Sequence, residues 1–423
     1  MVDRLHRFAD KVNARVQAAE GLPFALFMYA PLLVDIVRKL AAYTPSIPQA
    51  ASGLVRNLLY VAIFLFAALK AINARQVRLF SFVAFVFLAI MGVSVLASPG
   101  VSALAFETIL IFLSRCLVGL YFGHSVRDFK RLVSWLKALS VFALIYAVMI
   151  ILTGQRAADY MTLSYNLLVP LMIATWSALN EKNIWQGLAG IIFLFTVLAF
   201  GARGPLLCYF AFAGIYLVKY FFQDFKRTYP VLEALLAGAL LASLNLRPLL
   251  DLVNRLLPSS RTLSMALKGD LLNSSGRAGI YKAVWEAIKK SPLSMKGLLA
   301  DRIIVSEHLR RQVSEGYYAH NLFLELSVNF GVVIGAVLTA GLLLYSVLAY
   351  LRFEKMNDRY ASLVYAVFAS YVLVEVQVSS SYLTNAFFWV LVGLIWNAMS
   401  QKEPTIFRKK AVITEQSGDV QFR

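Results

Sequence analysis

The stretch LFSFVAFVFLAIMGVSVLA at residues 79–97 contains no charged side chain. A helix of about 20 apolar residues is long enough to cross a hydrocarbon core roughly 30 Å thick, because it rises about 1.5 Å per residue. This stretch therefore predicts a transmembrane helix.

The whole chain follows the same pattern. Of its 423 residues, 60% are hydrophobic and 15% are charged, against about 45–50% and about 25% in ordinary soluble domains. This composition excludes a soluble enzyme and predicts an all-α, polytopic membrane helix bundle. Apolar stretches bounded by charges or turn residues predict about twelve spans, at residues 22–38, 52–72, 79–97, 103–121, 132–153, 163–179, 184–201, 204–222, 230–246, 326–350, 360–378 and 382–399.

The basic residues predict the orientation of these spans. With both termini in the cytoplasm, 22 Lys and Arg residues fall on the cytoplasmic side and 4 in the short loops opposite, as expected from the positive-inside rule. The predicted organisation has cytoplasmic tails at 1–21 and 401–423, spans within 22–246 and 321–400, and a long, partly helical periplasmic loop at 247–320. The polar N-terminus lacks a signal-peptide pattern, so we expect a retained tail.

The cysteine and histidine positions indicate neither a disulfide framework nor a metal site. Cys116 and Cys208 lie inside apolar stretches, and the four histidines lack ligand spacing. We therefore expect no metal and no cofactor.

The long loop is basic, with twelve Lys and Arg residues against six Asp and Glu. Long loops cross the membrane largely regardless of charge, so this excess indicates an anionic partner; no feature suggests nucleic acid. Within it, RAGIYKAVWEAIKK (277–290) predicts a helix, which could lie at the membrane interface or against the bundle. Its expected apolar face comprises Ile280, Val284, Trp285 and Ile288.

Three residues at the outer boundaries are candidate functional groups. Arg203 lies in AFGARGPLL (199–207), where glycines permit close approach to a ligand and a helix start favours an anion. Arg277 opens the loop helix after NSSG, so its guanidinium and the helix start could bind one anion. His320, in GYYAHNLFLELSVNFG (316–331), could accept a hydroxyl proton.

Each candidate also has a structural interpretation. Arg203 could snorkel to the interface, Arg277 could belong to a solvated helix start, and His320 could orient a loop. Tyr165 and Asn166, in TLSYNLLVP (162–170), could bind a sugar or cap a helix. For Arg56, Arg115 and Lys137, pairing with Asp35, Glu107 or carbonyl groups is the expected role.

Three motifs in sequence, ARGPLL (202–207), SSGRAGIYKAVWEAIKKSP (274–292) and YAHNLFLELSVNFG (318–331), resemble the O-antigen polymerase and O-antigen ligase superfamily. The resemblance implies an integral-membrane glycosyltransferase of the bacterial inner membrane that takes a glycan from undecaprenyl diphosphate at the periplasmic face. It implies that Arg203 and Arg277 bind the diphosphate, that His320 lies at the acceptor hydroxyl, and that Tyr318, Asn321 and Arg302 support substrate binding. Many relatives have a glycine-rich stretch where this chain has SPLSMKGLLADR (291–302).

The physical chemistry agrees with this resemblance. Fixed guanidinium groups can neutralise a leaving diphosphate without a metal, and attack opposite the leaving group inverts the anomeric carbon. The acceptor would be a lipid-linked repeat for a polymerase, which we favour, or lipid A-core for a ligase. A transporter of lipid-linked sugars is the further alternative, although the sequence shows no internal repeat. A partner that regulates chain length is left open.

Overall fold

The structure is a computed structural model that describes residues 21–43, 50–73, 76–153, 160–200, 202–223, 277–314 and 316–401. Within these ranges the chain is helical and forms no strand. Nine helices there are long and apolar enough to cross a membrane. They are α2 (Gly21–Tyr43), α3 (Ala50–Asn73), α4 (Val77–Ala97), the continuous helix made by α5 (Ser102–Ile111), a π-helical segment and α6 (Leu117–Ser125), and then α7 (Phe129–Thr153), α8 (Tyr160–Asn180), α10 (Arg203–Gln223), α17 (Val332–Lys355) and α18 (Arg359–Val378).

Two further expected spans form shorter apolar helices, α9 (Ile184–Phe200) and α19 (Ala386–Ser400). The expected span at 230–246 lies outside the described residues, as do both tails and residues 247–276 of the expected loop. The prediction of an all-helical membrane protein is therefore confirmed, while the count of twelve spans stays a prediction.

The expected span at 326–350 is wrong at its N-terminal end. Gly331 interrupts the helix and separates α16 (Leu322–Phe330) from α17. Gly331 has φ of 84°, and a Cβ atom there would lie 3.1 Å from the carbonyl oxygen of Leu293. A residue with a side chain would be strained at this angle. The apolar pattern continues across the break, so hydropathy alone does not reveal it.

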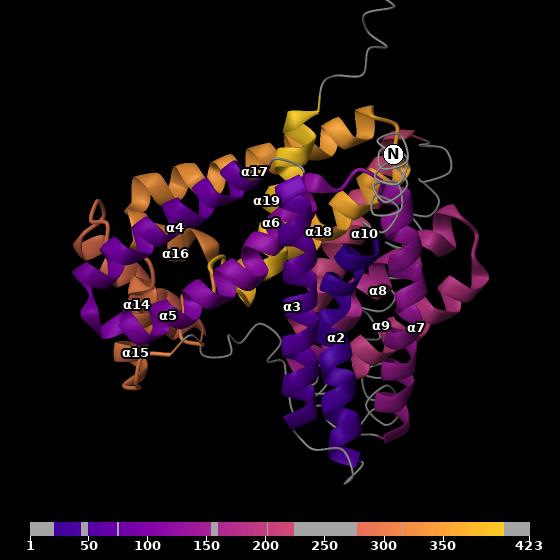
Figure 1. Cartoon of the computed structure of the whole chain (residues 1–423), viewed down its shortest axis with the longest axis horizontal. Helices are drawn as coiled ribbons and strands as arrows, with labels where there is room; N and C mark the ends of the chain where they lie inside the picture. The colour runs from indigo at the N-terminus through magenta and orange to yellow at the C-terminus, as the bar shows by residue number, and fades with distance from the viewer. Residues whose placement is uncertain are drawn as a thin grey trace, which may run out of the picture.

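The helices pack into a bundle with a smaller helical group beside it. In Figure 1, α2, α3, α7, α8 and α9 run alongside one another, and contacts join α2 to α3 and α7, and α8 to α9. Helix α10 packs on α18, and α6 packs closely on α19. Apolar side chains on α3, α4 and α17 remain exposed, as expected for helices that face lipid.

The loop helix expected at 277–290 is present as α14 (Arg277–Lys290). It packs on α16 and on α15 (Ala300–Leu309), a helix that the sequence analysis did not predict. Val284 and Ile288 are buried in this contact, and Trp285, on the same predicted apolar face, is 40% exposed. Part of the apolar face of α14 therefore packs against neighbouring helices.

The expected partner of Lys137 is wrong. Lys137 pairs with Glu181, and Asp35 pairs with Arg38, which is one helical turn away. Arg115 lies over the ring of Tyr60. Facing and local partners thus neutralise the charges of Lys137 and Asp35, as the cost of burying a charge requires.

Candidate functional site

His320 occupies the loop that leads into α16. Its backbone has φ of 51°, a left-handed conformation that is unfavourable for a residue with a side chain. Two tyrosines hold it there: the Tyr281 hydroxyl donates to the His320 carbonyl oxygen at 3.2 Å, and the Tyr318 ring centroid lies 4.0 Å from the imidazole. The contact from α14 thus holds the His320 backbone, and the ring of Tyr318 in the same loop packs against the imidazole.

The surroundings of His320 keep its imidazole neutral. Burial, together with the positive charges of Arg277 and Arg302, lowers its pKa to about 4. Its Nδ1 atom is buried and has no hydrogen-bond partner among the described residues. A neutral imidazole with an unused nitrogen can accept a proton.

Arg277 is the first residue of α14, where the unpaired N–H groups of a helix start favour an anion. Its guanidinium is close enough to Tyr165, Tyr318 and His320 to interact electrostatically with each of them. Within the described part of the chain, no carboxylate forms an ion pair with it. The positive charge is therefore available to an anion.

Arg203 begins α10, and the next residue, Gly204, packs against Tyr165. A Cβ atom on Gly204 would lie 2.7 Å from the Tyr165 hydroxyl and 3.4 Å from the Ser379 hydroxyl. Only glycine allows this close approach. Tyr165 also interacts with Arg277. The N-terminal ends of α10 and α14, which carry Arg203 and Arg277, therefore lie near the same tyrosine.

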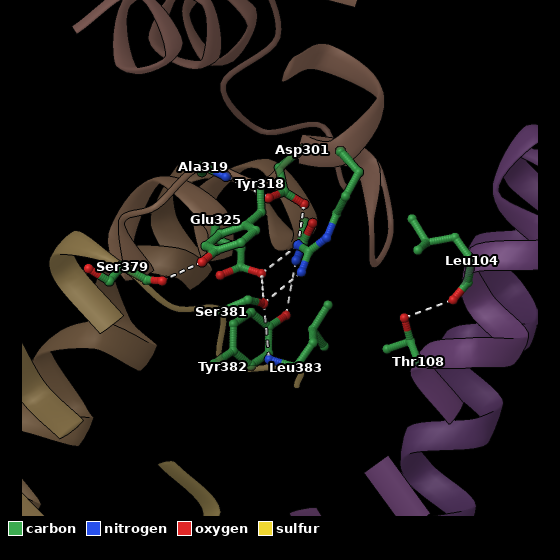
Figure 2. Close-up of polar contacts among 12 residues, drawn as sticks. Leu104, Thr108, Asp301, Tyr318, Ala319, Glu325, Ser379, Ser381, Tyr382 and Leu383 are labelled. Carbon is green, nitrogen blue, oxygen red and sulfur yellow. Dashed lines mark hydrogen bonds and ion pairs between the residues drawn. The ribbon is translucent and has the colours of Figure 1, made fainter. Parts of the chain in front are cut away.

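Tyr318 joins this group to the end of α18. Its hydroxyl donates a hydrogen bond to the carbonyl oxygen of Ser379, and Figure 2 shows the two residues meeting across the loop. Burial raises the pKa of Tyr318, so the phenol remains protonated and keeps this hydrogen bond. The structure thus brings Arg203, Arg277, Tyr318 and His320 to one end of the bundle.

Arg302 lies over the ring of Tyr318, with its Cζ atom 5.4 Å from the ring centroid. It is at the centre of a buried polar group, which we call the Arg302 cluster and define as Asp301, Arg302, Glu325 and Ser381. The Arg302 side chain is 0% exposed. One terminal nitrogen donates to Asp301 at 2.7 Å and to Glu325 at 2.6 Å, and the other donates to Ser381 at 2.7 Å. The second Asp301 oxygen accepts from the Ala319 N–H at 3.0 Å. The cluster therefore ties α15, α16 and the 379–385 segment to the loop that carries His320.

This geometry does not support the expected substrate-binding role of Arg302. Burial opposes its charge, but Asp301 and Glu325 outweigh burial and raise its pKa. Both terminal nitrogens already bind protein oxygens, so a diphosphate would have to displace a carboxylate. Asn321, also expected to support substrate binding, caps α16 by accepting from the Leu324 N–H at 3.1 Å.

Tyr165 and Asn166 line a cavity of about 270 Å³ between α2, α8 and α18. Two residues of this cavity, Glu375 and Ser379, were missed by the sequence analysis. Glu375 carried a usable signal, because an acid within an apolar span is a functional candidate by default. Ser379 carried none, since a serine at a helix end is common.

Residues 188–340, less than half of the chain, match the family model described as O-antigen ligase. The match supports the O-antigen polymerase and ligase superfamily and confirms the resemblance drawn from the three motifs. No curated protein matches the chain. The matched family indicates a membrane enzyme of the glycosyltransferase type.

The matched region of the O-antigen polymerase and ligase superfamily contains Arg203, Arg277, Tyr318 and His320. The cavity residues Tyr165, Asn166, Glu375 and Ser379 all lie outside it. The candidate site is thus built from the family region together with helices that the match does not cover.

Proposed function

We propose that this protein is an inverting, metal-independent glycosyltransferase that moves a glycan from undecaprenyl diphosphate to a sugar hydroxyl at the periplasmic face of the bacterial inner membrane. The observation that carries the proposal is the pairing of a neutral histidine, His320, with a nearby arginine, Arg277, that has no acidic partner among the described residues. A base and a fixed cation are the two groups that this reaction needs.

The proposed step forms one bond and breaks one. The acceptor oxygen attacks the anomeric carbon, and the bond from that carbon to the diphosphate oxygen breaks with its electron pair. His320 takes the hydroxyl proton, and the departing diphosphate is neutralised by Arg277 and Arg203. Because attack occurs opposite the leaving group, the anomeric configuration inverts.

Donor binding should strengthen the base. The positive charge of Arg277 lowers the pKa of His320, so a bound diphosphate that offsets this charge raises that pKa towards its ordinary value of about 6.5. A histidine titrating near the working pH is a more effective general base. The histidine would therefore gain basicity when the lipid-linked donor is in place.

The acceptor has two candidates. The Arg-Gly and His-Asn motifs resemble polymerases more closely, so we place polymerisation of lipid-linked repeats first. The description of the matched family as O-antigen ligase favours the second candidate, transfer to lipid A-core. Purified protein in liposomes should be given lipid-linked repeats with and without lipid A-core. A ladder formed without the core supports a polymerase, and product formed only with the core supports a ligase.

A transporter of lipid-linked sugars is tested by His320→Ala. For a transferase we expect about 10²–10⁴-fold slower transfer, the usual contribution of a general base, with undecaprenyl diphosphate binding kept within about twofold. His308→Ala is the matched control, because His308 is exposed on α15. Transfer at the unaltered rate in His320→Ala would contradict the proposed chemistry, as would retention of configuration or loss of activity with EDTA.

A further inference from the structure

We propose that the cavity lined by Tyr165, Asn166, Glu375 and Ser379 binds one monosaccharide unit of the glycan substrates. This inference rests on the proposed glycosyl transfer and assigns a role to helices α8 and α18, which lie outside the matched family region.

The cavity holds hydrogen-bonding groups whose capacity is unused. Among the described residues, the Asn166 amide nitrogen is buried without a hydrogen-bond partner, and the buried Tyr165 and Ser379 hydroxyls have only each other. An unpaired buried group costs about 1–3 kcal/mol when nothing binds it. Buried polar groups are nearly always fully paired in proteins, so this set of groups around one cavity indicates a polar occupant.

The chemistry of these groups selects a polyhydroxylated occupant. The Asn166 amide nitrogen donates, the two hydroxyls can donate or accept, and a carboxylate oxygen accepts. Glu375 is held at the cavity wall because its Oε2 accepts from the Asn385 amide at 2.6 Å. A sugar ring carries hydroxyls that both donate and accept, and this mixed set matches them.

The remaining walls suit a sugar ring as well. Tyr165 and Tyr371 stack with ring centroids 5.6 Å apart, and Tyr29 and Phe387 complete an aromatic lining. Flat apolar walls with a few convergent polar groups are typical of small-molecule sites. The volume of about 270 Å³ lies near the lower end of ligand pockets, which have about 300–1,000 Å³, as expected for a site that takes one sugar ring.

The two other parts of a lipid-linked glycan fit the cavity poorly. A diphosphate needs cations, whereas the cavity offers a carboxyl group and no Lys or Arg among its lining residues. An isoprenyl chain would leave the Asn166 amide nitrogen unpaired, at a cost of about 1–3 kcal/mol, and would offer the Tyr165 and Ser379 hydroxyls no further partner. The cavity is therefore not the diphosphate site.

The position of the cavity places a sugar next to the reacting groups. Ser379 lines the cavity and its carbonyl oxygen accepts from Tyr318, which contacts His320. Gly204 packs on both Tyr165 and Ser379 and brings the start of α10, which carries Arg203, to the same wall. A ring bound here therefore lies near both the proposed diphosphate cations and the proposed base.

Two sugars could occupy this place: the first sugar of the donor, which is bonded to the diphosphate, or the terminal sugar of the acceptor. Both have the same chemistry, and steady-state kinetics separates them. The test compares Asn166→Leu, which replaces the amide at similar volume, with Glu375→Gln, which can keep the Asn385 contact through its amide oxygen but loses the carboxylate.

Each variant should raise one KM about tenfold, the effect of losing one hydrogen bond to a buried group. A raised donor KM with unchanged affinity for sugar-free undecaprenyl diphosphate assigns the cavity to the donor sugar. A raised acceptor KM assigns it to the acceptor. The controls are Asn180→Leu, about 21 Å away along α8, and Glu354→Gln, whose carboxylate pairs with Lys219; both should leave each KM within about twofold.

The inference is overturned if neither KM changes, or if affinity for sugar-free undecaprenyl diphosphate falls as much as affinity for the glycan. If the unaltered protein transfers no glycan, the proposed function fails. A binding measurement then still tests whether the cavity takes a sugar. Saturation-transfer NMR with the free repeat-unit oligosaccharide should then give a signal that Asn166→Leu weakens and Asn180→Leu keeps. An equal signal in all three proteins, or none, overturns the cavity as a sugar site.

Discussion

The Arg302 cluster and the Tyr165 cavity lie on either side of Tyr318 and Ser379, yet they differ in how their polar groups are paired. In the cluster, the guanidinium is paired with two carboxylates and a hydroxyl, although Arg302 Nε and one Glu325 oxygen have no hydrogen-bond partner among the described residues. In the cavity, the Asn166 amide nitrogen has no partner among the described residues, and the Tyr165 and Ser379 hydroxyls have only each other. Paired buried charges rigidify a structure, whereas an unpaired polar group on a cavity wall is costly and calls for a ligand. The difference assigns a supporting role to one region and a binding role to the other.

The two arginines of the loop show the same contrast. Arg302 is fully buried and neutralised by Asp301 and Glu325, while Arg277 forms no ion pair within the described ranges. The sequence distinguishes them only in part. Arg302 directly follows Asp301, one of its two partners, whereas Arg277 follows the uncharged stretch NSSG. The second partner of Arg302, Glu325, is 23 residues away, and only the structure shows it.

The largest expected effect is on stability, from Arg302→Ala. Removing the guanidinium leaves two carboxylates buried without a cation, which should cost about 3–5 kcal/mol. The loss should appear as a lower thermal unfolding midpoint in detergent, measured at several scan rates. The double variant Arg302→Met with Glu325→Gln should restore part of the loss, because it removes one of the two carboxylates that would otherwise be buried without a cation.

The control for this prediction is Lys289→Ala. Lys289 pairs with Glu286 at 3.2 Å on the surface of α14, with both side chains more than half exposed. Exposed ion pairs contribute little, so its midpoint should remain close to that of the unaltered protein. Equal midpoint shifts in Lys289→Ala and Arg302→Ala would mean that the cluster does not stabilise the loop.

A smaller effect, on donor binding, is expected from Arg277→Ala. A hydrogen bond to a charged group contributes about 1.5–3 kcal/mol, so affinity for undecaprenyl diphosphate should fall about 10–100-fold while the unfolding midpoint changes little. Binding measured at rising ionic strength should lose most of its salt dependence in this variant. Lys290→Ala, on the exposed face of the same helix, removes an equal charge and should bind nearly as the unaltered protein does. Unchanged affinity in Arg277→Ala would remove this arginine from the diphosphate site.

The pH dependence sharpens the comparison of charges around His320. Its pKa is lowered to about 4, and the neutral form is the active base, so kcat/KM should fall only below about pH 4 to 5 and stay level above it. In Arg277→Gln the loss of a nearby positive charge should raise this pKa, moving the acid limb towards the ordinary value of about 6.5. An acid limb already near pH 6.5 in the unaltered protein would contradict the buried, neutral histidine.

Much of the fold could be predicted because hydropathy records burial in lipid directly. The uncharged stretch at 79–97 becomes α4 at Val77–Ala97, and most other described spans begin or end within a few residues of expectation. The break at Gly331 could not be predicted, since apolar residues continue on both sides and only φ distinguishes it. Helix α15 was also missed, because its contacts with α14 and α16 come from tertiary packing.

The sequence indicated the charged residues of the candidate site but not the residues that pair with them. Arg277 and His320 were found because charge and titratable groups at a membrane boundary are unusual. The role of Arg302 depended on Glu325, which is 23 residues away, and on Ser381, which is 79 residues away. No local pattern reports pairings of that range. Glu375 could have been found by listing every acid within an apolar span.

The smallest expected effect tests whether Asn321 caps a helix or binds substrate. Its side-chain oxygen accepts from the Leu324 N–H at 3.1 Å, so Asn321→Ala should lower the free energy of unfolding by about 1 kcal/mol, the usual worth of an N-cap. Asn321→Ser keeps a capping oxygen but is too short to present an amide to a sugar, so it should restore stability and, if capping is the whole role, activity too. Recovery of stability without recovery of kcat/KM would instead assign Asn321 to the substrate, and would extend the binding region from the Tyr165 cavity across Tyr318 to the start of α16.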